Sequence, residues 1–140
     1  MSHGPAPSHE LIDHTSEIQL RVRAGSFADL LAESGRAVAE LQLPRGHSAP
    51  AAGRRQLRLT APDRERLLVD WLNELIFLAE TDRWVATEFQ IDRADGTSVV
   101  ATVRGVEVPQ VRGLVKAATM HALHVREVNS MIEAEVILDI

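Results

Sequence analysis

The sequence predicts a compact single domain of the α+β class, with two helices packed on an antiparallel or mixed β-sheet. Three observations lead to this prediction. The chain has 140 residues and 45% hydrophobic content, which suits one buried core. Two segments carry apolar residues at helical spacing, and several others alternate between apolar and polar residues. The expected order of elements is β-α-β-α-β-β-β-β.

In the first half of the chain, residues 17–23 alternate as in a half-buried strand. Ser26 is a suitable N-cap for a helix over residues 27–42. A Gly- and Pro-containing loop then precedes a short strand over residues 56–60. Pro62 suits the first position of a second helix, whose wide apolar face we expect to be buried against a sheet.

In the second half, residues 85–91 and 99–103 alternate around Asp95-Gly96, which predicts a β-hairpin. Residues 114–128 are ambiguous by periodicity. One strand face would contain Val115, Ala117, Thr119, Leu123 and Val125. Asn129-Ser130 predicts a turn into a last strand over residues 131–140. Residues 1–9 lack apolar periodicity and are expected to form a flexible tail before a domain over residues 10–140.

Composition excludes several classes of function. The chain has no cysteine, which rules out disulfides, thiolate catalysis and cysteine-ligated zinc. A formal net charge of −5 argues against extensive electrostatic attraction to a nucleic-acid backbone. If RNA is involved, we expect a partner protein to bind it. With no long apolar run or signal peptide, the expected location is the cytoplasm, without membrane contact.

The first polar constellation is Asp13-His14-Thr15-Ser16-Glu17, which lies just ahead of the first predicted strand. Asp13 and Glu17 offer the carboxylate oxygens that hard divalent cations prefer. The alternative interpretation is a solvated turn in which Asp13 or Thr15 caps backbone amides.

The second constellation is Asp139 with Ile140 at the end of the sequence. Together with Glu17, their oxygens would make a small hard-cation site, provided the last strand ends beside the start of the first. The alternative is an ordinary frayed strand end.

The third constellation runs from Lys116 to residue 123 and includes Thr119 and His121. In a helix, His121 and His124 would share a face and could contribute to a zinc site, although no third ligand has fitting spacing. In a strand, the two histidines diverge, and a hydrogen-bonded core or edge histidine is expected. Neither a Gly-rich phosphate loop nor an arguable Ser-His-Asp arrangement is present.

Taken together, these motifs resemble the archease family. The family has an acidic-His-Thr-Ala-Asp box, a late Lys-Ala-x-Thr-x-His-x-Leu motif and a terminal Asp-Ile, and its Leu-Leu-x-x-Trp-Leu-x-Glu-Leu run matches residues 67–75. Glu17 and Ser16 stand where the family has Asp and Ala. The resemblance covers residues 10–140 and implies a compact α+β fold.

The resemblance also implies a function. Archeases are non-catalytic partners of a tRNA-splicing RNA ligase and promote its guanylylation by GTP and its turnover. A divalent cation, calcium first with magnesium or manganese as alternatives, would be held by Glu17, Asp139 and Ile140, with Asp13 nearby. The partner-facing motif would contain His14, Thr15, Lys116, Thr119 and His121.

Two other classes of function remain open. One is a chaperone-like module that binds protein clients through a sheet edge or apolar patch, with the acidic residues incidental. The other is a small metal-dependent phosphoesterase, in which His14 or His121 would act as a general base.

Overall fold

A computed structural model describes residues 6–14, 16–44, 46–47, 50–111 and 115–140. It contains two helices and seven strands in two antiparallel sheets. The elements are β1 Ser8–Asp13, β2 Glu17–Ala24, α1 Phe27–Gln42, β3 Ala52–Thr60, α2 Arg64–Asp82, β4 Trp84–Ala94, β5 Ser98–Glu107, β6 Ala117–Val128 and β7 Met131–Asp139.

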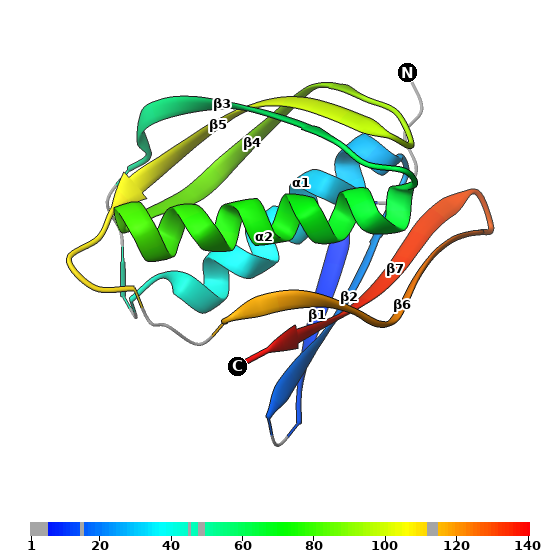
Figure 1. The fold of residues 1–140 in the computed structure, drawn as a ribbon, viewed down its shortest axis with the longest axis horizontal. Coiled ribbons are helices and arrows are strands. Elements are labelled where there is room, and N and C mark those ends of the chain that lie inside the picture. The colour runs from blue at the N-terminus through cyan, green and yellow to red at the C-terminus, as the bar shows by residue number, and fades with distance from the viewer. Residues whose placement is uncertain (1–5, 15, 45, 48–49, 112–114) are drawn as a thin grey trace.

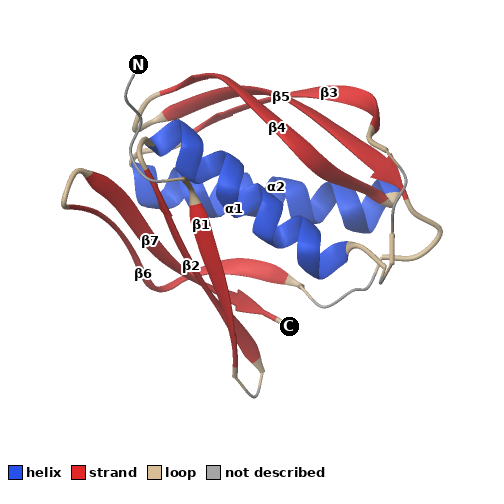
Figure 2. Cartoon of the chain, turned by 180° about the vertical axis from the view of Figure 1, so that it is seen from behind, coloured by secondary structure: helices blue, strands red, loops and turns tan. Residues whose placement is uncertain are grey.

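The helices lie between the two sheets (Figures 1 and 2). Sheet A has the strand order β1-β2-β7-β6, and sheet B has the order β3-β5-β4. The inward side chains of both sheets join the buried faces of α1 and α2 in one main core. Each sheet therefore has an inner face on the helices and an outer face. Within the described part of the chain, neither helix combines the length and apolarity required to cross a membrane.

The α+β class and the single compact domain are confirmed, and so are several local predictions. Helix α1 has the predicted bounds, and the Ser26 hydroxyl accepts a hydrogen bond from the Asp29 amide, as expected of an N-cap. The β4–β5 turn is built on Asp95, whose carboxylate accepts from the amides of Thr97 and Ser98. The final hairpin turn has left-handed backbone at Asn129 and Ser130, with φ of 52° and 66°.

The amino-terminal strand β1 corrects two expectations. It adds an element to the predicted order, and it includes Ser8 and His9, which the sequence analysis placed in a flexible tail. Strand β1 pairs antiparallel with β2, and its Leu11, opposite Leu20, packs against the core. This hairpin pairing with the next strand orders a segment that is too polar to be recognised as a strand by itself. Residues 1–5 lie outside the described residues.

Helix α2 begins two residues later than Pro62 suggested. Asp63 is the N-cap, and its carboxylate accepts from the Arg66 amide at 2.8 Å. The predicted burial of the helix is confirmed at Trp71, which is fully buried. The Trp71 indole N–H donates to the Leu31 carbonyl at 2.9 Å and so ties α2 to α1.

Strand β6 resolves the ambiguity of residues 114–128 in favour of a strand, but the predicted face is wrong. Ala118 and Val125 are its buried residues, an odd number of positions apart. The register against β7 shifts between Thr119 and His124, and Ala122 within this bulge has a φ of 53°. A bulge of this kind moves later side chains to the opposite face, which simple alternation cannot predict.

Strand β6 is also an edge of sheet A, and helix α2 covers part of that edge. The side-chain amide of Asn73 donates to the Ala118 carbonyl at 3.1 Å and accepts from the Ala118 amide at 2.8 Å. Both backbone groups of Ala118 are therefore satisfied by one side chain from the helix.

Candidate functional site

The candidate site lies where the last strand meets the first polar box. In the antiparallel pairing of β2 with β7, Glu17 is directly opposite Asp139. Their neighbours Ile18 and Leu138 face the core, so alternation places Glu17 and Asp139 on the outer face of sheet A. Directly opposed residues have Cβ atoms about 5 Å apart. The juxtaposition that the sequence analysis required is therefore present.

Backbone hydrogen bonds fix this end of the sheet. The Ile140 amide donates to the Ser16 carbonyl at 3.3 Å, and the Lys116 amide donates to the Asp139 carbonyl at 2.8 Å. The His14 amide donates to the Glu17 carbonyl at 2.9 Å and closes the β1–β2 turn. Residues from all three predicted constellations thus hold Glu17 and Asp139 in register, and the oxygens of Ile140 follow directly after Asp139.

Asp13 does not share this position. It is opposite Ile18 in the β1–β2 pairing, which assigns it to the inner side of sheet A, at the exposed end of the strand. Because side chains alternate between the two faces of a sheet, Asp13 lies on the opposite face from Glu17 and Asp139. Its expected place among the ligands is not supported by the register.

The late motif is divided by the bulge in β6. Thr119 is opposite Ile137 and its hydroxyl donates to the Ile137 carbonyl at 3.2 Å, one row along the outer face from Asp139. His121 is exposed within the bulge, and no hydrogen bond to it is found among the described residues. His14 and Lys116 are exposed. Thr15, also predicted to belong to the functional motif, lies outside the described residues.

A ladder of charged side chains continues along the same outer face. Glu135 accepts from the Gln19 amide at 2.7 Å and lies 3.3 Å from Arg21, and Arg23 pairs with Glu133. These arginines and glutamates line a polar hollow of about 300 Å³. Every carboxylate of this ladder has a cationic partner, whereas no ion pair to Glu17 or Asp139 is found among the described residues.

The donor set of Glu17 and Asp139 fits a hard cation only in part. Carboxylate oxygens are the ligands that calcium, magnesium and manganese prefer. However, in the described residues no three His, Asp or Glu side chains come together to hold a metal. Two carboxylates with the oxygens of Ile140 suit an ion that completes its coordination with water or with groups from a second molecule.

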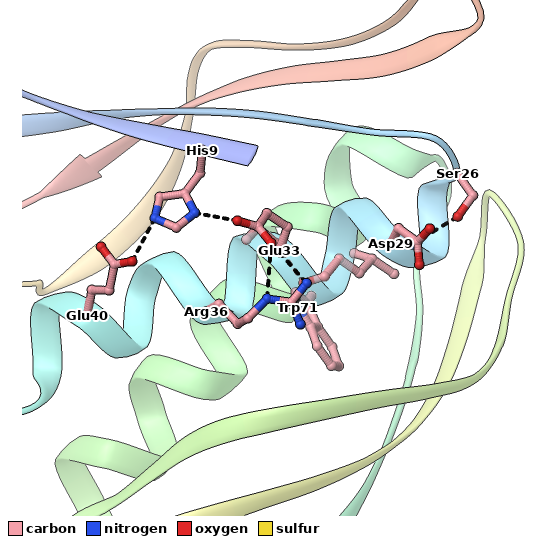
Figure 3. Close-up of polar contacts among 9 residues, drawn as sticks. His9, Ser26, Asp29, Glu33, Arg36, Glu40 and Trp71 are labelled. Atoms are coloured by element: carbon pink, nitrogen blue, oxygen red, sulfur yellow. Dashed lines mark hydrogen bonds and ion pairs between the residues drawn. The ribbon is translucent and has the colours of Figure 1, made fainter. Parts of the chain in front are cut away.

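A second polar cluster, shown in Figure 3, was not predicted from the sequence. The two ring nitrogens of His9 lie 2.6 Å from the Glu33 carboxylate and 2.9 Å from the Glu40 carboxylate. Arg36 also contacts Glu33 at 2.9 Å. Burial raises the pKa of Glu33, but the hydrogen bonds and positive charges of His9 and Arg36 outweigh it and leave that pKa lowered. The cluster fastens β1 to α1.

One feature of the sequence could have revealed this cluster. Glu33 is a carboxylate on the buried face of a helix, where a charged group needs a partner. The sequence does not single out His9 as that partner, because His47 lies nearer to Glu33 along the chain.

Comparison with known proteins identifies the family. Residues 9–140 match the Archease protein family (MTH1598/TM1083). The archease of Methanothermobacter thermautotrophicus is 34% identical over 96 residues, covering 64% of this chain and 69% of that protein. The archease of Methanosarcina barkeri is 28% identical over 144 residues, covering 94% of this chain and 95% of that protein.

Two solved structures are similar along nearly the whole chain. The solution structure of Methanobacterium thermoautotrophicum protein 1598 has a TM-score of 0.76 and 27% identity, with 94% of this chain and 98% of that chain covered. The crystal structure of "an archease, possible chaperone" from Thermotoga maritima has a TM-score of 0.67 at 21% identity, covering 92% and 94%, and supports the fold alone. With the family profile matched from residue 9 to residue 140, this chain belongs to the archease family.

Proposed function

We propose that this chain is a non-catalytic activator of an RNA-splicing ligase, which promotes guanylylation of the ligase by GTP and its multiple turnover. The observation that carries the proposal is the direct pairing of Glu17 with Asp139 on the outer face of sheet A. Membership of the archease family supports it. In this proposal the chain acts in the cytoplasm, and RNA is joined by the ligase.

The incomplete donor set favours an ion shared between two proteins. Glu17, Asp139 and the oxygens of Ile140 would hold a divalent cation, calcium first or else magnesium or manganese, and leave coordination positions open. Such an ion would supply positive charge beside the phosphates of GTP during nucleotide transfer. The residues of this chain hold and orient the ion, and the exposed outer face allows the ligase to reach it.

The test is an assay of ligase guanylylation with GTP and of multiple-turnover RNA joining, with and without this protein. The wild-type chain should stimulate both reactions at substoichiometric and equal amounts. The double variant Glu17→Gln, Asp139→Asn should lose the stimulation, because it removes both charges while it keeps the size of the side chains. Thermal unfolding of the variant confirms that it is folded.

The matched control is the double variant Glu80→Gln, Glu107→Gln. Both glutamates are exposed on other parts of the surface, so the control makes the same change in net charge. It should stimulate the ligase as the wild type does. An absence of stimulation by the wild type, or equal stimulation by the Glu17 and Asp139 double variant, would contradict the proposal.

A second candidate function, a chaperone-like module for protein clients, is favoured by one observation. Met120 in the β6 bulge is 50% exposed, next to a sheet edge that Asn73 covers only at Ala118. Exposed apolar groups beside an open edge can bind unfolded segments. A Met120→Ser variant should then suppress the heat aggregation of a client such as citrate synthase less well than the wild type, while the Glu17 and Asp139 variant keeps full suppression.

A further inference from the structure

The outer face of sheet B carries a group of arginines that the proposed function does not use. Arg54 and Arg58 on β3, Arg104 on β5 and Arg93 on β4 are all exposed. Their partners in register place them on one face. Arg54 is opposite Arg104, and Arg58 and Arg93 flank Val100 from either side. Val99, Ala101 and Val103 of β5 point into the core, so the arginines point away from it.

Within the part of the chain that the structure describes, these four arginines have no ionic partner. Every ion pair found there involves other cationic side chains. Two acidic residues share the face, Glu88 opposite Arg104 and Asp92 near Arg93. Asp92 accepts hydrogen bonds from Gln90 and Thr102. The face therefore has more cations than anions, on a chain with a net charge of −5.

The arrangement is regular and shallow. At the usual strand spacing, Arg58 and Arg93 lie about 10 Å apart across the sheet, and Arg54 and Arg58 lie about 13 Å apart along β3. Arg58 and Arg93 line a hollow of about 280 Å³, and Arg104 lines a second hollow of about 150 Å³. Neutral hydrogen-bonding groups, namely Gln56, Thr102 and Gln90, form the row between the arginines, and Thr60 and Ser98 form the next row beyond Arg58 and Val100.

We propose that this outer face of sheet B binds the phosphate backbone of duplex RNA. Guanidinium groups match phosphate oxygens in charge and geometry, and neutral donors between them suit sugar and phosphate contacts. Duplex RNA is recognised largely through its backbone and shape. The choice of RNA rather than DNA rests on the proposed function.

Other occupants fit this surface less well. A protein partner would require an apolar centre, and between residues 54 and 60 and between residues 98 and 104 the outward positions hold only Val100 as an apolar side chain. Single-stranded RNA is usually bound by stacking its bases on exposed aromatic rings, and none stands at these positions. An overall negative charge restricts the attraction to this patch, so binding should be weak and strongly dependent on salt.

The experiment measures fluorescence anisotropy of a labelled 20-base-pair RNA duplex with the full chain, from 50 to 200 mM salt. Four phosphate contacts predict a slope of about −3.6 in log affinity against log salt, a loss of about 150-fold across this range. The quadruple variant Arg54→Gln, Arg58→Gln, Arg93→Gln, Arg104→Gln should bring the slope close to zero and lower the affinity at 50 mM by at least tenfold.

The matched control replaces four exposed arginines that do have acidic partners, as Arg21→Gln, Arg23→Gln, Arg66→Gln and Arg126→Gln. This control variant should bind RNA with a salt dependence of affinity at least as steep as that of the wild type. If the patch variant fails to fold by circular dichroism, the pairs Arg54→Gln, Arg104→Gln and Arg58→Gln, Arg93→Gln should each remove about half of the slope.

Three results would overturn the inference. They are equal loss of binding in the patch and control variants, tighter binding to a DNA duplex of the same sequence, and binding to phosphatidylserine vesicles or polyglutamate but not to RNA. The assay contains no ligase, so its failure leaves the stimulation test at Glu17 and Asp139 unaffected. Conversely, failure of that test would leave a measured RNA affinity in place.

Discussion

Replacing Glu17 by Gln should make the metal-free protein more stable while it removes the response to a divalent cation. Glu17 is directly opposite Asp139, and no cationic partner to either was found in the described residues. Like charges at opposed positions of a β-ladder destabilise the pair. With carboxylates about 6 Å apart near water, their repulsion amounts to about 0.7 kcal/mol.

Compared with the wild type, Glu17→Gln should be more stable without the cation and less stable with it. In EDTA, removal of this repulsion should raise the melting temperature of Glu17→Gln by about 2 °C, given roughly 3 °C per kcal/mol for a chain of this size. With cation at one hundred times its dissociation constant, the wild type should gain about 2.7 kcal/mol, or about 8 °C. The variant should gain much less, so the order of stability reverses.

The assay is thermal unfolding by circular dichroism in EDTA and in a series of calcium, magnesium and manganese concentrations. Near 1 M salt, where charges are screened within about 3 Å, the difference in EDTA should disappear. Glu80→Gln, an exposed charge elsewhere, serves as the control. A variant that is less stable than the wild type in EDTA, or that gains as much from the cation, would refute the reasoning.

Two further predictions concern packing and pH. A Cβ at Gly105 would lie 2.4 Å from the Val85 carbonyl oxygen, so Gly105→Ala should lower the free energy of unfolding by about 2 kcal/mol or more in urea titration, whereas Gly96→Ala, with open space around it, should change it little. The pKa of Glu33 is lowered from 4.5, because contacts such as that with His9 outweigh desolvation. The ionised form of Glu33 therefore stabilises the fold above about pH 4.5, and this contribution is lost as pH falls through the folded-state pKa. The melting-temperature difference between wild type and Glu33→Gln should shrink from pH 6 to pH 3, and a difference that is constant with pH would show that ionisation of Glu33 contributes nothing.

Local signals in the sequence were sufficient for much of the fold. The bounds of α1 could be predicted because Ser26 is a good cap and the apolar period continues to residue 42. The β4–β5 hairpin could be predicted because Asp95-Gly96 separates two alternating runs. In both cases the determining interactions join residues that are close in sequence.

What was missed leaves no periodic pattern in the sequence. Strand β1 is ordered by its hairpin pairing with the next strand, β2, and by contacts of His9 with two glutamates of α1 that lie 24 and 31 residues away. The bulge in β6 reverses the expected face after Thr119. For the candidate site, Glu17 and Asp139 were predicted together because a last strand beside the first would align them, whereas Asp13 was included without knowledge of its register.

The Asn73 amide has a consequence for assembly. By bonding to both the N–H and the C=O of Ala118, it occupies the position that the backbone of an added strand would take. Sheet A therefore cannot be extended continuously along β6 by a neighbouring copy, because pairing in register would have to displace the amide. One side chain on a helix thus limits open-ended polymerisation and leaves β1 as the edge of this sheet at which another chain can dock without such displacement.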